Sequence, residues 1–250
     1  MNADEYDLMY RVEDDHWWYA GMRAISGAIL AGPAGGIPPA RILDAGCGTG
    51  RNALELSKLG EVTGIDLSPR AIRLCTERGL TRLARASVGD MPFAGETFDL
   101  VTAFDVLCHA AVVDERATLQ EFWRVLRPGG RLLLHLPAYA WLKSTHDQAV
   151  HNERRYAAPD VRAMLRAAGF TVVRLTYANT LLFPLAALKR LAERPRAEQR
   201  SSDLDTAFGP MGPLFRGILA LEARVIRHVD LPFGLTLVAL ARKDAAPETR

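Results

Sequence analysis

A glycine-rich stretch at residues 42–50 (ILDAGCGTG) constrains the fold of this chain more than any other feature. An apolar pair leads into Asp44, and residues 51–58 then follow the pattern of a helix. Glycines at such a point let a ligand lie against the backbone, and a helix N-terminus offers N–H groups to an anion. Residues 61–67 (EVTGIDL) then form a second predicted strand that ends in an acid, Asp66. Strand, glycine turn, helix, strand and acid in this order predict a nucleotide or nucleoside site on a doubly wound sheet.

The spacing of the glycines separates two kinds of nucleotide site. A dinucleotide-binding turn has the pattern Gly-x-Gly-x-x-Gly, whereas Gly46, Gly48 and Gly50 stand two residues apart. With an acid before it and an acid after it, this pattern resembles the class I S-adenosylmethionine-dependent methyltransferases. The resemblance implies that the loop backbone holds the methionine part of the cofactor and that the carboxylate of Asp66 accepts both ribose hydroxyls. Glycines that serve only packing are the alternative. The cofactor-binding residues expected here are Asp44, Ala45, Gly46, Cys47, Gly48, Gly50, Asp66 and Leu67.

A third apolar stretch closes with residues 88–93 (VGDMPF), and a fourth begins at residues 97–101 (TFDLV). In the family that the chain resembles, an acid after the third strand reaches the adenine amine, and the next backbone N–H reaches a ring nitrogen. Asp90 and Met91 would fill these roles, because an acceptor beside a donor matches the edge of adenine. The alternative is an ordinary turn with Asp90 in solvent.

Composition is that of an ordinary globular protein and narrows the function classes. The 250 residues are 49% hydrophobic and 24% charged, and the net charge of +2 gives no reason to expect a nucleic-acid partner. Three cysteines without a Cys-x-x-Cys spacing fit a reducing compartment. The N-terminus lacks the pattern of an export signal, and the apolar run at 181–188 is too short to span a bilayer. A cytoplasmic location is therefore expected.

We expect a single methyltransferase domain over residues 1–250, with an α/β fold. Its Rossmann-like, doubly wound sheet would contain about seven mostly parallel strands with an antiparallel last strand. The parts are an N-terminal helical cap (1–38), the core (40–177 and 231–243) and a helical insertion (178–230). Strands are predicted near 41–45, 61–66, 84–89, 98–104, 130–136, 170–177 and 234–242. Helices are predicted near 3–31 with a break at 14–15, and near 51–58, 69–78, 114–126, 159–168, 179–194 and 211–228. Residues 127–130 are predicted to form a turn, and residues 195–206 a mobile charged segment.

Ligands on such sheets lie at the carboxyl ends of the strands, so the residues after the fourth and fifth strands are candidates for chemistry. Phe104 ends the fourth strand beside the expected cofactor, and His109 follows as either a base or a structural residue. The segment 143–156 resembles loops in one branch of the type 11 methyltransferases. Its histidines, His146 and His151, are candidate general bases. Its candidate substrate-binding residues are Arg154, Arg155 and Tyr156.

Both interpretations of the segment 143–156 stay open at this point. A polar loop whose arginines pair with acids or cap helices is the alternative to a substrate-binding loop. Two histidines and a carboxylate also suggest a metal, but their spacing matches no helical ligand pair, so no metal is expected.

Aromatic residues of the cap, in the sequence HWWY at 16–19, resemble the same branch. Trp17 or Tyr19 could place an aromatic face beside the cationic sulfonium, a contact that contributes about 0.5–2 kcal/mol. Arg23 could reach the cofactor carboxylate. Trp18 is expected to serve packing.

The expected reaction is methyl transfer to a small molecule, at a hydroxyl or an amine, with S-adenosylhomocysteine as the second product. Residues 105–108 lack both the Asn/Asp-Pro-Pro-Tyr/Phe element of nucleic-acid amino methylation and the paired glutamates of arginine methylation. We therefore expect a role in small-molecule biosynthesis, as a monomer or homodimer. The apolar insertion leaves peripheral membrane contact open. An NAD(P)-dependent oxidoreductase and a non-catalytic S-adenosylmethionine-binding protein are the alternatives.

Overall fold

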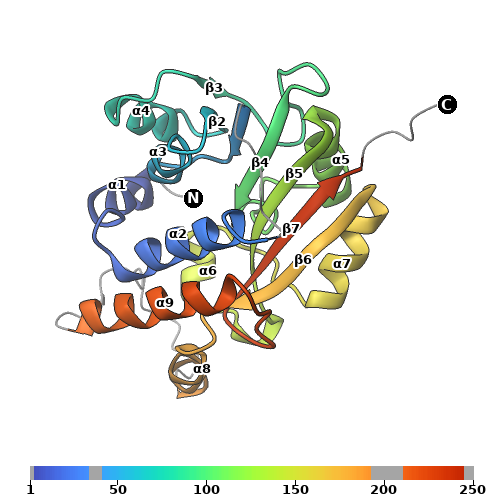
Figure 1. The fold of residues 1–250 in the computed structure, drawn as a ribbon. Coiled ribbons are helices and arrows are strands. Elements are labelled where there is room, and N and C mark those ends of the chain that lie inside the picture. The colour runs from blue at the N-terminus through green and yellow to red at the C-terminus, as the bar shows by residue number, and fades with distance from the viewer. Residues whose placement is uncertain (1–2, 34–40, 193–210, 245–250) are drawn as a thin grey trace.

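A computed structural model of the chain describes residues 3–33, 41–192 and 211–244. Figure 1 shows helices on both faces of a central sheet. The strands are β1 (Arg41–Ala45), β2 (Glu61–Asp66), β3 (Leu83–Arg85), β4 (Phe98–Phe104), β5 (Leu126–Pro137), β6 (Phe170–Ala178) and β7 (Thr236–Lys243). The helices are α1 (Ala3–Val12), α2 (Trp17–Leu30), α3 (Arg51–Leu56), α4 (Pro69–Glu77), α5 (Glu115–Val125), η1 (Ala140–Leu142), α6 (Thr145–Ala149), α7 (Ala158–Ala167), α8 (Phe183–Ala192) and α9 (Gly212–Ile226).

The sheet confirms the predicted fold class. Its seven strands have the order β3-β2-β1-β4-β5-β7-β6. The pairs from β3 to β5 are parallel, and β7 runs antiparallel to both β5 and β6. The chain order reverses between β1 and β4, and such a switch point opens a crevice at the carboxyl ends of the strands.

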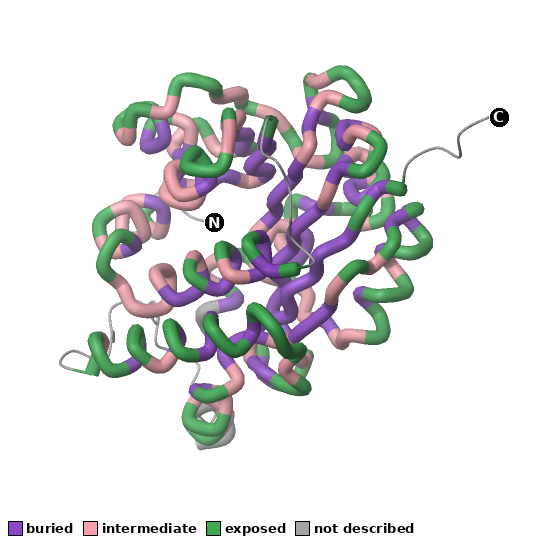
Figure 2. The backbone as a smooth tube through the Cα atoms, in the orientation of Figure 1, coloured by how far each residue is buried: buried purple, intermediate pink, exposed green. Residues whose placement is uncertain are grey.

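The central strands are buried along most of their length (Figure 2), and their side chains alternate between two apolar layers. On one face Leu43, Leu132 and Leu134 pack against α5 and α7. On the other face Ile42 and Leu133 pack against α2, α3 and α9. This alternation follows from the period of two in a strand, and burial on both faces explains why the strands are almost continuously apolar in sequence.

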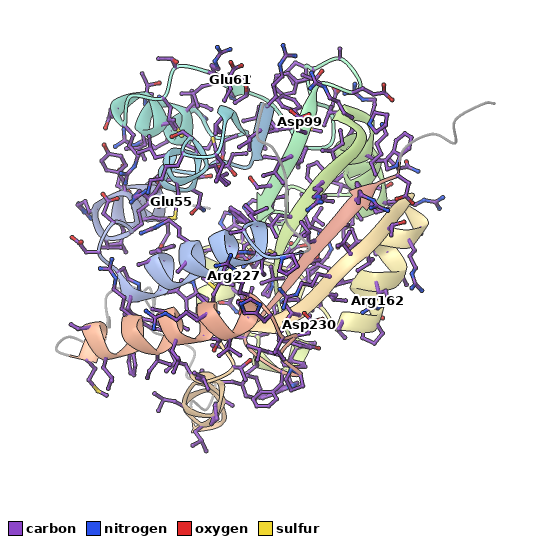
Figure 3. The ribbon with its side chains drawn as sticks, in the orientation of Figure 1. Glu55, Glu61, Asp99, Arg162, Arg227 and Asp230 are labelled. Atoms are coloured by element: carbon purple, nitrogen blue, oxygen red, sulfur yellow. The ribbon has the colours of Figure 1, made fainter. Side chains whose placement is uncertain are left out.

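Helices α2 and α9 pack closely because α2 has a glycine where they meet. A Cβ atom added to Gly21 would lie 2.2 Å from Leu219 Cδ1, so any larger side chain would separate the two helices. Many charged side chains are exposed, among them Glu61, Arg162 and Asp230, which are labelled in Figure 3. No helix within the described ranges is long and apolar enough to cross a membrane.

Several predicted boundaries were wrong in detail. The predicted strand at 84–89 is shorter and ends at Arg85, while residues 127–130 lie inside β5 at an irregularity in its pairing with β4, where Gly129 has a φ of +80°. The helix expected from 179 begins at Phe183, and the segment 143–156 contains the short helix α6. The predictions for 34–39 and 195–206 lie outside the described residues.

Candidate cofactor and acceptor site

A cavity of about 500 Å³ lies at the carboxyl ends of the central strands. Its walls come from α1, α2, the glycine loop, the end of β2, residues 86–88, and the loops that follow β4 and α6. Carboxylates of Glu5, Glu13, Asp66 and Asp105 line it. These acids suit a ligand that carries positive charge and hydroxyl groups, and both are features of S-adenosylmethionine.

The glycine loop forms the floor of this cavity through Gly46, Cys47 and Gly48. Gly46 has a φ of +80°, and a Cβ atom there would lie 2.5 Å from Val106 Cγ2. Only glycine fits both this conformation and this space. The N–H groups of Gly46 and Cys47 both donate to the Ile65 carbonyl oxygen, at 2.8 and 2.9 Å. The loop therefore presents bare backbone to a ligand, while these donors fix its shape.

Asp66 ends β2 and lines the cavity with Leu67 beside it. Its carboxylate accepts from the Gly48 N–H at 3.0 Å, from the Ser68 N–H at 2.8 Å and from the Tyr6 hydroxyl at 3.4 Å. Burial raises the pKa of Asp66, and the two backbone N–H donors oppose this. The carboxylate is thus held rigidly at the edge of the cavity, where the prediction required a ribose-binding acid.

Three other predicted loop residues lie behind the cavity wall. Asp44 is almost fully buried, and the Thr102 hydroxyl donates to its Oδ1 at 2.9 Å. Ala45 is completely buried. A Cβ on Gly50 would lie 2.7 Å from Leu80 Cδ1, so this glycine serves the packing of the loop. None of these three residues belongs to the described lining of the cavity. A substitution at any of them would therefore affect ligand binding indirectly, by changing the shape of the glycine loop.

Asp90 and Met91, which were predicted to contact adenine, do not belong to the described lining of the cavity. The Met91 side chain is buried, and its N–H donates to Glu121 Oε2 at 3.1 Å. Asp90 is exposed and outside the cavity lining. Because β3 ends at Arg85, the residues that reach the cavity come earlier, and they are Ser87 and Val88.

The structure places the two tryptophans of the cap differently from the prediction. Trp17 packs away from the cavity, with its ring 5.2 Å from the ring of Phe215 in α9. Trp18 and Tyr19 line the cavity. The packing of Trp17 against Phe215 in α9 thus determines which aromatic side chains of α2 line the cavity.

Arg23, which was predicted to reach the cofactor carboxylate, does not belong to the described lining of the cavity. Its guanidinium donates to the carbonyl oxygens of Glu13 and Asp14, at 2.9 and 3.2 Å, and so ties α2 to the end of α1. Glu13 itself accepts from the Thr49 hydroxyl and pairs with Arg78, with 2.8 Å between Nη2 and Oε1. The cap is thus fastened to the glycine loop through a buried acid.

His109 and His151 meet at the mouth of the cavity. Their ring centroids are 5.7 Å apart, and both residues line the cavity. The Ala111 N–H donates to Nδ1 of His109 at 3.1 Å. Burial lowers the pKa of His109 to about 4, so its ring is neutral at neutral pH. The side chain of His146 lies outside the described part of the structure.

The predicted substrate-binding residues of the segment 143–156 hold the loop in place instead. Arg155 pairs with the buried carboxylate of Asp147 at 2.9 Å and donates to the Ala138 carbonyl at 2.9 Å. Arg154 lies 3.6 Å from a carboxylate oxygen of Glu115, and the Tyr156 hydroxyl donates to the other oxygen of Glu115 at 2.5 Å. None of the three belongs to the described lining of the cavity, so the geometry does not support direct substrate binding by these residues, which stays a prediction.

Sequence reasoning missed a buried histidine in the cavity wall. His135 lies near the end of β5, and its Nε2 is 3.0 Å from the Ser26 hydroxyl of α2. The ring of Phe104 lies 4.3 Å from the His135 ring. Burial lowers the pKa of His135 to about 3, so the ring stays neutral. A single polar residue within the apolar run 132–136 was the signal that could have revealed it.

Within the described ranges, no group of three or more His, Cys, Asp or Glu side chains is placed to hold a metal ion.

Comparison with known proteins points to one kind of domain. Residues 43–134 match the family model of a methyltransferase domain. The chain is 39% identical over 145 residues to a ubiquinone/menaquinone biosynthesis C-methyltransferase of Syntrophotalea carbinolica, covering 53% of this chain and 56% of the relative. It is 34% identical over 151 residues to an O-methyltransferase of Aspergillus nomiae, covering 54% and 66%. The chain therefore spans between half and two thirds of the length of these curated relatives. The fold is similar to that of an S-adenosylmethionine-dependent methyltransferase from Thermotoga maritima, with a TM-score of 0.61, 18% identity and 96% of both chains covered.

Proposed function

The chain belongs to the class I S-adenosylmethionine-dependent methyltransferases, and on this premise we propose that it transfers a methyl group from S-adenosylmethionine to a small-molecule acceptor. The acceptor atom is a hydroxyl oxygen or an amine nitrogen. The observation that carries the proposal is one cavity that is lined both by the hydrogen-bonded carboxylate of Asp66 and by the closely spaced rings of His109 and His151.

The cofactor lies with its ribose hydroxyls on Asp66 and its methionine part along Gly46, Cys47 and Gly48. Ser87 and Val88 flank the adenine, because they line the cavity near the end of β3. The aromatic faces of Trp18 and Tyr19 lie on the cap side, where they would stabilise the sulfonium charge. This assignment keeps the predicted ribose contact and replaces the predicted adenine contacts.

The reaction needs positioning more than acid–base chemistry. When bound, S-adenosylmethionine supplies a methyl group on a positively charged sulfur that departs as a neutral thioether. The protein holds the acceptor atom in line with the carbon–sulfur bond and keeps water out, and these effects provide most of the acceleration. A hydroxyl acceptor also releases a proton, and His151 with His109 is the group at the cavity mouth that takes it.

The other expectations from the sequence become parts of this proposal. We assign residues 1–38 to a cap, 40–177 and 231–243 to the catalytic core, and 178–230 to an insertion. The protein acts in the cytoplasm on a small molecule without a nucleic-acid partner, as a monomer or homodimer. Neither alternative function, oxidoreductase or non-catalytic binding protein, draws support from the comparisons above.

The test separates an enzyme from a binding protein. Purified protein is titrated with S-adenosylhomocysteine by calorimetry, and methyl transfer from labelled S-adenosylmethionine to a panel of phenols, catechols and amines is then measured. We expect His151→Ala to bind S-adenosylhomocysteine normally and to lose about 100-fold or more in turnover of a hydroxyl acceptor. His228→Ala, at an exposed position outside the cavity lining, is the matched control. Tight binding without transfer to any acceptor would reject the enzyme and leave the binding protein.

A further inference from the structure

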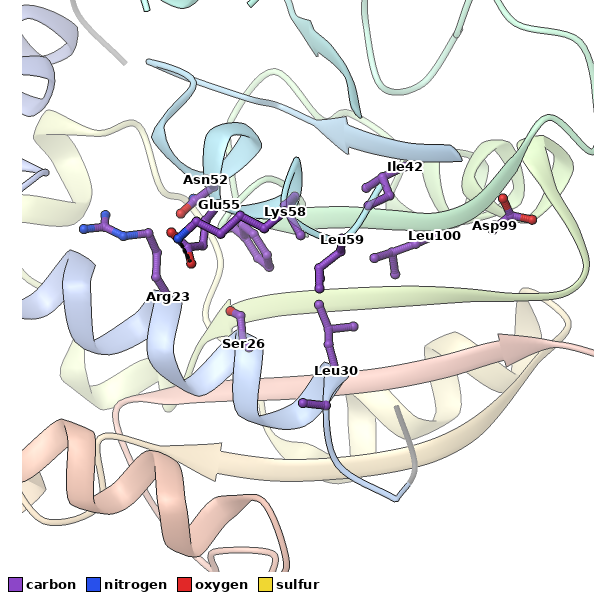
Figure 4. A pocket seen from close by; sticks show the side chains of 14 residues that line it. Arg23, Ser26, Leu30, Ile42, Asn52, Glu55, Lys58, Leu59, Asp99 and Leu100 are labelled. Atoms are coloured by element: carbon purple, nitrogen blue, oxygen red, sulfur yellow. Dashed lines mark hydrogen bonds and ion pairs between the residues drawn. The ribbon is translucent and has the colours of Figure 1, made fainter. Parts of the chain in front are cut away.

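A second hollow lies between α2 and α3, next to strands β1 and β4 of the sheet. Its volume is about 340 Å³. Figure 4 shows Leu30 approaching from α2, Leu59 from the end of α3, and Ile42 and Leu100 from the sheet. We call this hollow the α2–α3 groove. Its remaining lining residues are Arg23, Ser26, Gly27, Ala31, Asn52, Glu55, Leu56, Lys58, Asp99 and Phe104.

The charged residues of the α2–α3 groove already have partners in the protein. Lys58 pairs with Glu55 at 2.7 Å, and Asp99 pairs with Arg127 at 3.0 Å. Arg23 is held by backbone carbonyls at the end of α1. The surface left for a ligand is therefore the apolar part of the lining, which favours hydrocarbon.

The α2–α3 groove adjoins the cofactor cavity. Ser26, Asn52 and Phe104 line both spaces. Leu59 lies at the open side of the groove and is 39% exposed. The two spaces therefore meet at these shared residues, and an alkyl chain attached to a head in the cavity has only to pass them to enter the groove.

We propose that the α2–α3 groove binds an alkyl arm of the methyl acceptor, whose hydroxyl or amine head lies in the cofactor cavity. This inference rests on the proposed function and narrows its substrate class to acceptors that combine a polar reacting head with a flexible hydrocarbon chain. The lining residues that the two spaces share favour this occupant, because a ligand held in the cavity lies next to the groove. Residues 34–40, which join α2 to β1, are the competing occupant that the experiment must exclude.

Gly27 allows the groove to be filled without disturbing the fold. It lies on α2 in the groove lining, and a Cβ atom added to it has no heavy atom within 4 Å. Gly217 on α9 has the same open surroundings and lies outside the groove lining. Both are helical and neither has a positive φ, so leucine suits the backbone at either position. Gly27→Leu and Gly217→Leu are therefore matched variants.

The probes are phenol and 4-octylphenol, titrated by calorimetry with and without S-adenosylhomocysteine. The wild-type protein should bind 4-octylphenol about ten-fold or more tightly than phenol, because several methylenes leave water. Gly27→Leu should lose this preference, and Gly217→Leu should keep it. Leu59→Lys, at the exposed rim, should weaken 4-octylphenol binding without blocking the groove. All variants should bind S-adenosylhomocysteine as the wild type does.

The inference is overturned if the wild type shows no preference for 4-octylphenol or if Gly27→Leu retains it. A crystal structure with residues 34–40 in the groove would have the same consequence. Failure of the proposed function is a separate result, because it appears as absent S-adenosylhomocysteine binding or absent methyl transfer, while the phenol titrations need neither.

Discussion

Replacing Asp44 with asparagine should remove a pH dependence that this carboxyl group imposes on the free energy of unfolding. Asp44 is 1% exposed, and Thr102 donates to one of its oxygens. The other oxygen, Oδ2, is buried without a hydrogen-bond partner among the described residues. Burial disfavours the charged form and raises the pKa of Asp44 from 3.8 to about 7.

The sign and size of the effect follow from this pKa difference. Between about pH 4 and pH 7 the folded protein keeps a proton on Asp44 that the unfolded chain has already lost. The Asp44 contribution to stability is therefore complete below pH 4 and declines as the pH rises towards 7. Each pH unit removes about 1.4 kcal/mol, so about three units remove roughly 4 kcal/mol, an upper value for one buried group. Above pH 7 the contribution stays constant.

The measurement is urea unfolding of the wild type and Asp44→Asn at several pH values from about 4.5 to 8. Other titrating groups are common to both proteins and cancel in the difference. The stability of Asp44→Asn relative to the wild type should rise with pH and then level off near pH 7. Asp90→Asn, at an exposed position, serves as the control. A difference between wild type and Asp44→Asn that does not change with pH would refute a neutral buried Asp44.

Three further predictions concern the cavity and its loop. Asp66→Ala should weaken S-adenosylhomocysteine binding by about 100-fold or more, because a ligand loses two hydrogen bonds to a charged acceptor, whereas Asp90→Ala should leave calorimetric affinity unchanged. Trp18→Ala should weaken the affinity for S-adenosylmethionine by about three- to thirty-fold, while Trp17→Ala should instead lower the free energy of unfolding by roughly 3 kcal/mol. Arg155→Ala should lower stability by about 3–5 kcal/mol in urea unfolding, because it leaves a buried carboxylate unpaired. An equal loss of cofactor affinity in Asp66→Ala and Asp90→Ala, or in Trp18→Ala and Trp17→Ala, would contradict these assignments. An Arg155→Ala variant as stable as the wild type would do the same.

The sheet could be predicted from sequence because the buried strands are apolar and every connection except that between β3 and β4 contains a helix pattern. The exact end of a short strand could not. The apolar residues from 83 to 88 allow several ends, and pairing with β2 stops at Arg85. That early end brings Ser87 and Val88, and not Asp90 and Met91, to the cavity. A shift of three residues changes which side chains line the cavity, while the fold prediction stays correct.

The sequence also could not predict which side of α2 faces the cavity. Aromatic residues at 17, 18 and 19 leave open which of them faces the ligand. Docking against α9 decides it, since Trp17 and Phe215 pack together. This contact joins segments about 200 residues apart in a chain whose local pattern gives no sign of it. Contacts of that kind limit what helical periodicity can predict.

In the segment 143–156, we assign the chemical role and the structural role to different residues, His151 and Arg155. Backbone hydrogen bonds fix His151 opposite His109: the Ala110 N–H donates to the His151 carbonyl at 2.9 Å, and the Glu153 N–H donates to the Cys108 carbonyl at 2.9 Å. These bonds do not involve the imidazole rings, so removing the His151 side chain should leave the loop in place. The ion pair of Arg155, in contrast, holds the loop and lies outside the cavity. A loss of turnover at unchanged stability in His151→Ala, beside a loss of stability in Arg155→Ala, is therefore the pattern that this division of roles requires.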